Sequence, residues 1–257
     1  MQAGHLPVWR LVALSYSDVW RALRAMPLLF SCAILIFLAA RVAEQLLPMR
    51  AWNGPVFGTL ADVLENAVQY FCVAPVMIAI HRFVVRGDVT RSYVVDLADR
   101  AFLTFFAWTM AVSVLFSLVF ALSEALITYG RTGAISPFAA LIPSLISVVA
   151  AIWLALRLIV LFPAIAVRAP GAKATNAFAD TKGFGLRLIA IFLLAFIPLV
   201  AVAVLSTTAL GRGIMVRGSA LSVISIVFGA VLGTLVEALG VIVASHIYLA
   251  IGRRVRG

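Results

Sequence analysis

Four polar residues inside long apolar stretches of this sequence have side chains suited to chemistry. They are Glu65, Gln69, Arg157 and Glu237. An ionisable side chain in hydrocarbon costs free energy, so its presence there is by default a hypothesis about function. A carboxyl group can carry a proton or bind a cation, and an arginine can bind a phosphate or pair with an acid. These four residues are the candidate intramembrane polar site.

Glu237 lies in the stretch GAVLGTLVEALGVIVASH, which occupies residues 229–246. Gly229, Gly233 and Gly240 share its helical spacing, and small residues so spaced let helices pack closely. We therefore expect Glu237 to face protein rather than lipid. Two interpretations stay open. The acid either forms a hydrogen bond across a helix interface, or it binds a proton or cation in a transport step.

A second polar group begins the apolar stretch ADVLENAVQYF. Asp62, Glu65, Asn66 and Gln69 are separated by three and four residues, so they share one helical face. This face is either a helix end that reaches the outer headgroups or part of a polar cavity. The first interpretation suits Asp62, and the second suits Gln69, which lies nearly two turns further along.

Arg157 and His246 are the remaining ionisable candidates. Arg157 lies several residues inside an apolar stretch, where its side chain either extends to the headgroups, pairs with an acid or binds a lipid phosphate. His246 is interpreted as a packed hydrogen-bonding residue or as a proton relay.

Familiar catalytic and metal-binding motifs are missing from the sequence. It has no P-loop, no G-x-S-x-G and no H-E-x-x-H motif. The three histidines are widely separated, and Cys32 and Cys72 both lie in apolar stretches as small core residues. We therefore predict no catalytic residue, no metal site and no cofactor.

Composition indicates a membrane protein. The chain has 257 residues, of which 64% are hydrophobic and 12% charged, and its mean hydropathy is +1.14. A soluble domain is about half apolar and about a quarter charged. Several apolar stretches are long enough for a helix to cross about 30 Å of hydrocarbon. Because backbone groups find no water partner in lipid, we expect an all-α bundle.

Six transmembrane helices are predicted within one membrane domain that covers residues 1–257. They lie near residues 27–47, 60–81, 101–123, 139–162, 186–208 and 226–251. When the cytoplasmic ends of the second and sixth spans are aligned, Glu65 and Glu237 lie at nearly the same depth. Both are then expected in the outer half of the bilayer.

The net charge of +10 at pH 7 suits anionic lipid better than nucleic acid, because the basic residues are spread through loops beside apolar spans. Fifteen of the 20 lysines and arginines lie on the side that holds both chain ends. The positive-inside rule assigns that side to the cytoplasm. The expected partners are membrane lipids with anionic headgroups. A protein partner or a homo-oligomer stays open.

Residues 7–25, PVWRLVALSYSDVWRALRA, predict an amphipathic elbow helix in the membrane interface. One face carries apolar side chains from Val8 to Leu23, and the opposite face carries arginines. Trp9 and Trp20 suit the headgroup region. A helix that binds a protein partner would show the same pattern.

The layout of elbow, span, outer turn and span recurs along the chain. Placing Gly87 on Gly171 also places Asp96 on Asp180, and Asp18 lies at a similar point of the first elbow. We interpret this as a three-fold repeat of elbow plus hairpin. The alternative is that any regular six-span protein shows such spacing.

One segment resembles a known family. Residues 157–189 contain an arginine, a Pro-Ala pair and an aromatic-x-x-Thr-Lys-Gly elbow, which are carried by Arg157, Pro163, Ala164, Phe178, Thr181, Lys182 and Gly183. The pattern resembles a poorly characterised group of bacterial six-helix inner-membrane proteins. The group includes the membrane domain found beside some glycerophosphodiester phosphodiesterases. The resemblance implies a helical protein of the bacterial inner membrane. It supplies no chemistry, and these 257 residues hold no phosphodiesterase domain.

The sequence therefore supports two functional hypotheses. The first is a transport or permeability component for a small solute, ion or lipid, with Glu65, Gln69, Arg157 and Glu237 along its path. The second is a non-transporting scaffold or lipid-organising protein, in which the elbows and the basic face act. We do not expect enzymatic activity.

Overall fold

The computed structural model describes residues 7–46, 54–133, 136–210 and 220–257, and this part of the chain is helical without strands. The helices are α1 (Val8–Ala25), α2 (Pro27–Leu46), α3 (Gly54–Arg86), α4 (Arg100–Arg131), α5 (Pro137–Leu158), α6 (Leu161–Ala166), α7 (Ala174–Asp180), α8 (Gly185–Leu210), α9 (Ala220–Ile251) and α10 (Arg253–Arg256). Six segments among them are long and apolar enough to cross a membrane. The predicted all-α bundle is confirmed.

Four of the six spanning helices, α3, α4, α8 and α9, are longer than predicted. Helix α3 has 33 residues, and α4 and α9 have 32 each. At 1.5 Å per residue, a helix of that length measures about 50 Å, well beyond the hydrocarbon thickness of about 30 Å. These helices must tilt in the bilayer or extend past it.

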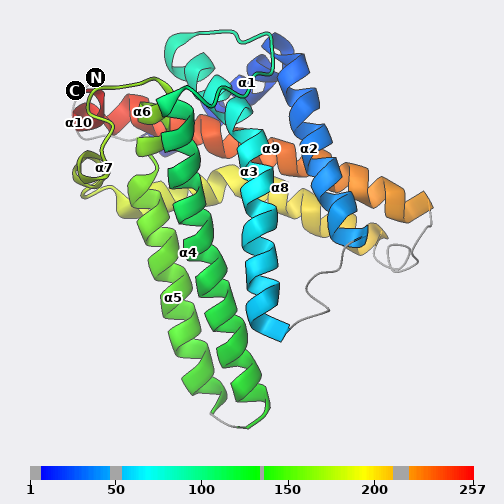
Figure 1. Cartoon of the computed structure of the whole chain (residues 1–257). Helices are drawn as coiled ribbons and strands as arrows, with labels where there is room; N and C mark the ends of the chain where they lie inside the picture. Colours follow the sequence, from blue (N-terminus) through cyan, green and yellow to red (C-terminus); the bar gives the residue numbers. More distant parts are fainter. Residues whose placement is uncertain (1–6, 47–53, 134–135, 211–219) are drawn as a thin grey trace.

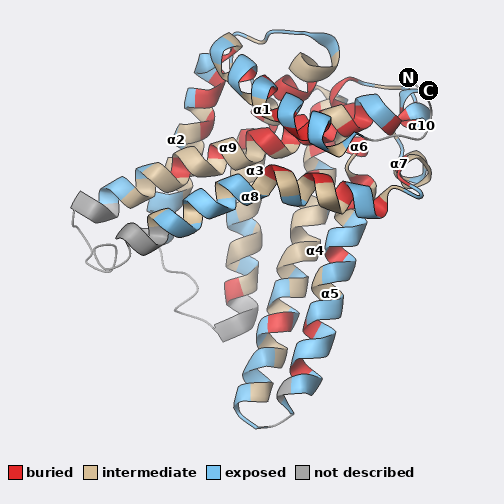
Figure 2. Cartoon of the chain, turned by 180° about the vertical axis from the view of Figure 1, so that it is seen from behind, coloured by how far each residue is buried: buried red, intermediate tan, exposed pale blue. Residues whose placement is uncertain are grey.

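The long helices converge at one end of the molecule and diverge at the other. Helices α3, α4 and α5 run side by side, while α8 and α9 run across them (Figure 1). The short helices α6, α7 and α10 gather with α1 at the convergent end. Figure 2 shows that the buried residues concentrate there as well. Contacts beyond single hairpins are therefore made mainly at this end.

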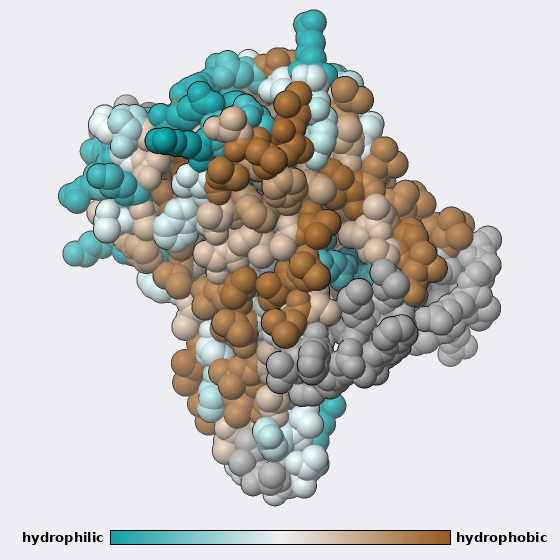
Figure 3. Space-filling model, in the orientation of Figure 1, coloured by the Kyte–Doolittle hydropathy of each residue, from teal (hydrophilic) through white to brown (hydrophobic). Residues whose placement is uncertain are grey.

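Helix α6 is the most completely buried element of the convergent end. Leu161, Pro163, Ala164, Ile165 and Ala166 are all buried in it. The helix contacts α3, α4 and α9. By contrast, the outer surfaces of the long helices keep their apolar side chains exposed, as the hydrophobic colouring of Figure 3 shows. Lipid is as apolar as these side chains, so no hydrophobic force drives them inward.

The fourth predicted span, 139–162, is interrupted. Helix α5 ends at Leu158, and α6 begins at Leu161 after a turn. Pro163 has no backbone N–H, so it cannot donate to the carbonyl of Ile159, and its ring crowds that carbonyl. The break therefore lies where a continuous helix would have lost a hydrogen bond. It also sets Arg157 in the last turn of α5.

The first elbow is a helix, but its apolar face meets protein. Helix α1 packs on α9 and α8. Leu11 and Val12 are buried, together with Ser15 and Asp18. The arginines of the opposite face are exposed, as expected. Helices α8 and α9 thus cover part of the apolar face, and the position of α1 in the membrane interface stays a prediction.

The predicted repeat is regular in its hairpins and irregular in its elbows. In the part of the chain that the structure describes, α2 pairs with α3, α4 with α5, and α8 with α9. Residues 87–99, the second expected elbow, form no helix. There, Gly87 adopts a φ of +78°, and the Tyr93 hydroxyl donates to the carbonyl of Cys72. The second copy therefore lacks its elbow helix, and the third contains two short helices, α6 and α7.

Candidate functional site

Glu237 lies in a small pocket between α2, α3 and α9. The pocket has a volume of about 10 Å³, and its other lining residues are apolar except for Thr234. Within the described residues, the Glu237 carboxyl group has no hydrogen bond or ion pair. The hydroxyl of Thr234 donates to the carbonyl of Ala230 instead. The expected hydrogen bond across a helix interface is therefore not formed within this part of the chain.

The structure does not bring Glu237 and Glu65 together, while their common depth in the bilayer stays a prediction. The Glu237 pocket is lined on α3 by Val73, Val76, Met77 and Ile80. Val73 is eight residues beyond Glu65, which corresponds to about 12 Å along a helix. Because α9 runs across α3, two residues at equal distances from the cytoplasmic ends of these helices need not lie side by side (Figure 1).

The polar face of α3 lies away from the Glu237 pocket. Glu65 is exposed, and Asp62, Asn66 and Gln69 are half-buried. Asp62 and Glu65 each have an interaction partner in the structure. None of these four residues lines the pocket around Glu237.

The predicted packing glycines behave differently from one another. A Cβ at Gly233 would lie 3.1 Å from the ring of Phe37, and a Cβ at Gly240 would lie 3.5 Å from Phe196. A Cβ at Gly229 would meet nothing within 4 Å. Gly233 and Gly240 therefore allow close contacts with α2 and α8 respectively, while Gly229 borders open space.

Arg157 binds backbone carbonyl groups rather than an acid. Its guanidinium donates to the carbonyl of Phe178 at 2.7 Å and to that of Thr181 at 3.1 Å. The Phe178 ring lies 5.7 Å from the guanidinium carbon, and the Thr181 hydroxyl donates back to the carbonyl of Arg157. The carbonyls at a helix C-terminus lack partners within the helix and carry partial negative charge. Arg157 thus joins the end of α5 to the end of α7.

The residues of the family resemblance form one structural unit around this contact. Phe178 and Thr181 are the aromatic and threonine of the elbow motif, and Gly183 follows with a φ of +84°. Pro163 and Ala164 are buried in α6 nearby in the sequence. The motif therefore has a structural explanation in this chain, which is the attachment of α7 to α5.

Two histidine contacts were not predicted as pairs. His246 Nε2 lies 3.0 Å from Asp18 Oδ2, and His81 Nδ1 lies 2.7 Å from the hydroxyl of Ser245. Both contacts connect α9 to another helix. The sequence does contain a signal for the first one. Asp18 shares a helical face with Leu11, which is buried, and so it belongs to the inward side of α1.

Arginine side chains also hold the carboxyl end of α6. Arg82 Nε donates to the carbonyl of Ala166 at 2.8 Å, and Arg86 donates to the carbonyl of Val167. Asp99 accepts hydrogen bonds from Arg168 and from the backbone N–H of Ala101. Burial alone would raise the Asp99 pKa, but these two hydrogen bonds and the nearby positive charges lower it below its ordinary value. Asp99 is therefore held as a carboxylate.

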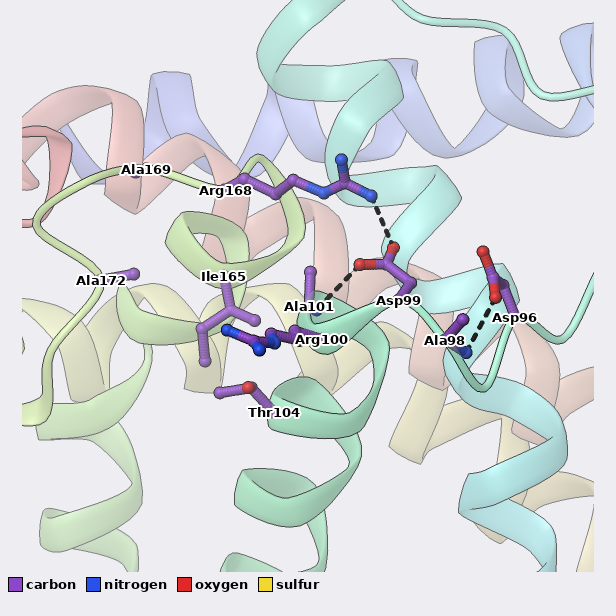
Figure 4. A pocket seen from close by; sticks show the side chains of 10 residues that line it. All are labelled: Asp96, Ala98, Asp99, Arg100, Ala101, Thr104, Ile165, Arg168, Ala169 and Ala172. Atoms are coloured by element: carbon purple, nitrogen blue, oxygen red, sulfur yellow. Dashed lines mark hydrogen bonds and ion pairs between the residues drawn. The ribbon is translucent and has the colours of Figure 1, made fainter.

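A cleft of about 670 Å³ opens beside this arginine cluster. Its walls are the start of α4 and the segment that leaves α6 (Figure 4). It is lined by Asp96, Ala98, Asp99, Arg100, Ala101, Thr104, Ile165, Arg168, Ala169 and Ala172. Sequence reasoning missed this site, because its two walls are about 65 residues apart in the chain.

The described residues contain no group of three or more His, Cys, Asp and Glu side chains arranged to hold a metal ion. No family model, curated protein or solved structure matches the chain. The resemblance to the six-helix group stays a prediction. The fold itself defines the class, which is a multi-pass integral membrane protein with six candidate spans.

Proposed function

We propose that this membrane protein binds anionic phospholipid at its cytoplasmic end and organises lipid there without transporting a solute. The observation that carries the proposal is the outward face of α1. Trp9 and Trp20 are 73% and 53% exposed on that helix, and Arg10, Arg21 and Arg24 are exposed beside them. Tryptophan favours the headgroup region, and arginine is attracted to anionic lipid.

The charge of this face is one-sided. Asp18 is the one acid in the sequence of α1, and it points inward to His246. Arg21 Nη1 forms an ion pair with Asp18 Oδ1 at 2.8 Å. The guanidinium carbon of Arg24 lies 4.6 Å from the centre of the Trp20 ring. A surface of arginine and tryptophan without an opposing exposed acid suits negatively charged headgroups.

The placement of the transport candidates supports this choice. Arg157 is engaged by the end of α7, and Glu65 lies on an exposed part of α3. Glu237 lines a pocket of about 10 Å³, which is room for one water molecule at most. Neither of the two cavities described above is lined by more than one of these candidates. The bacterial inner membrane and the cytoplasmic position of both termini remain parts of the proposal.

Lipid selectivity in reconstituted membranes tests the proposal. Spin-labelled phosphatidylglycerol is expected to associate with the protein more strongly than spin-labelled phosphatidylcholine. The double change Arg10→Gln with Arg24→Gln should reduce this preference about fivefold or more, because each arginine near the surface contributes about 1 kcal/mol. The matched control removes two exposed arginines elsewhere, by Arg91→Gln with Arg131→Gln. Equal selectivity in both double variants and the wild type would sink the proposal.

Transport is retained as a second candidate because of one observation. The carboxyl group of Glu237 lies in an apolar pocket, and it has no hydrogen-bond or ion-pair partner within the described residues. Proton flux into liposomes loaded with a pH-sensitive dye tests this candidate. Transport predicts a flux that Glu237→Gln abolishes and that Glu44→Gln leaves intact. If the protein adds no flux to that of empty liposomes, the transport role of Glu237 is lost.

A further inference from the structure

We propose that the cleft between the start of α4 and the segment after α6 binds a phosphate group, with Arg100 as its main ligand. The cleft volume of about 670 Å³ lies within the range of small-molecule sites, about 300–1,000 Å³. A bare phosphate would leave most of this volume empty. The size therefore suits a phosphate that carries an organic group, such as a glycerophospholipid headgroup.

Arg100 supplies an uncommitted positive charge. Figure 4 shows its side chain extending from α4 toward Ile165 on the opposite wall. Within the described part of the chain, Arg100 has no hydrogen bond and no ion pair. A guanidinium presents several N–H donors in a plane, and it binds two oxygens of a phosphate at once.

Arg168 places a second guanidinium beside the same cleft. Its backbone φ of +52° is in the left-handed region, which is unfavourable for residues other than glycine. The conformation turns the chain at the end of α6 and leads the side chain to Asp99, at 2.9 Å. Backbone strain of this kind concentrates at functional sites.

The charges around the cleft leave a positive excess. Asp99 is shared by Arg168 at 2.9 Å and Arg82 at 3.7 Å, so its charge is already balanced. Asp96 is the remaining acid of the lining, and its carboxylate accepts a hydrogen bond from the N–H of Ala98. Arg100 and Arg168 equal the two carboxylates of the lining in number. Arg82, which pairs with Asp99 from outside the lining, adds a third positive charge, and this excess favours an anion over a cation.

The rest of the lining suits the glycerol and the first acyl carbons of a lipid. Ala101, Ile165, Ala169 and Ala172 give it an apolar wall, and the hydroxyl of Thr104 can bind an ester or glycerol oxygen. A free phosphate compound shares the phosphate chemistry but makes no use of the apolar wall. That the phosphate comes from a membrane lipid rests on the proposed function. The residues of the cleft itself lie outside α1.

Calorimetry of the purified full chain in detergent tests the site, with dihexanoyl phosphatidylglycerol, dihexanoyl phosphatidic acid and inorganic phosphate as probes. Both short-chain lipids are expected to bind. Arg100→Gln should weaken their binding at least about tenfold, because a charge-assisted contact is lost. The control Arg91→Gln removes an exposed arginine outside the cleft and should leave binding unchanged. Since Arg100 has no partner in the described residues, its loss should not change the melting temperature.

Arg100→Gln binding as tightly as the wild type overturns the proposed site, and so does an equal loss in Arg91→Gln. Inorganic phosphate that binds as tightly as the short-chain lipids would overturn the lipid source and assign the site to soluble phosphate. The Arg10→Gln, Arg24→Gln double variant separates the two proposals. If it loses lipid selectivity but binds the short-chain lipids as the wild type does, the cleft binds lipid independently of α1.

Discussion

His246 Nε2 lies 3.0 Å from Asp18 Oδ2, and both side chains are largely buried, with 12% and 11% exposed. The contact joins the first helix of the chain to the last spanning helix. Arg21 binds the other oxygen of Asp18 at 2.8 Å, and the Tyr16 hydroxyl donates to the carbonyl of Ala195 on α8 at 2.6 Å. Helix α1 is therefore fixed to α8 and α9 by polar contacts as well as by packing.

Removing one side of this contact should release α1. Asp18→Ala is expected to cost about 2 kcal/mol in the free energy of unfolding, because hydrogen bonds to a charged carboxylate are lost. Denaturant titration in detergent micelles measures it, with Asp88→Ala, an exposed loop acid, as the control. His246→Ala in the same background should cost little more, because the two residues act through one contact. Simple additivity of the two changes would show that the contact is not formed.

Asp99 predicts a pH dependence of stability. Its folded pKa lies below the ordinary value of 3.8, so the ionised form stabilises the fold above that value. The stabilisation is lost as the pH decreases through the folded pKa. Asp99→Asn keeps a side chain that can begin α4 as an N-cap but removes the charge. The difference in melting temperature between the two proteins should be constant near pH 6 and shrink below about pH 4. A difference independent of pH would contradict this account.

Arg157 is predicted to act in folding rather than in transport. Arg157→Gln should cost about 2 kcal/mol in stability, because hydrogen bonds from a charged donor to two carbonyls are lost. Arg157→Lys should not restore it, since a point charge cannot match two carbonyls as a planar guanidinium does. Lys182→Gln, an exposed neighbour, is the matched control. Unchanged thermal stability with altered lipid binding would instead favour capture of a lipid phosphate by Arg157.

Replacing each of three glycines of α9 by alanine is expected to change stability by different amounts. Gly229→Ala should be neutral or stabilising by up to about 1 kcal/mol, because alanine favours helix and open space surrounds it. Gly233→Ala should be the most destabilising, because its Cβ would lie 3.1 Å from Phe37. Gly240→Ala should lie between the two. Melting temperatures of the three purified variants check the order, and a loss at Gly229 as large as at Gly233 would refute it.

The number and place of the spans could be predicted from the sequence because lipid imposes them. A stretch such as 186–208 has to be a helix of sufficient length, whatever its neighbours are. The break before Pro163 had a local signal as well. The elbow at residues 87–99 did not, since its conformation depends on a contact between Tyr93 and the carbonyl of Cys72 in α3.

The site was less predictable because it depends on how helices cross. Sequence periodicity indicated that Glu237 faces protein, and its pocket between three helices agrees with this. Alignment by helix ends did not show that Glu65 lies outside this pocket, because it assumes parallel helices. The partners of Arg157 and the cleft around Arg100 involve residues far apart in the chain, and no spacing within one helix reveals them.

Quenching of tryptophan fluorescence by brominated lipids tests the central claim most directly. Replacing Trp52, Trp108 and Trp153 by Phe leaves Trp9 and Trp20 as reporters on α1. In mixed liposomes, brominated phosphatidylglycerol should quench this emission more than brominated phosphatidylcholine at the same mole fraction. The excess should disappear at high salt, which screens arginine charges. Equal quenching by the two lipids, or none by either, would contradict the binding of anionic lipid by α1.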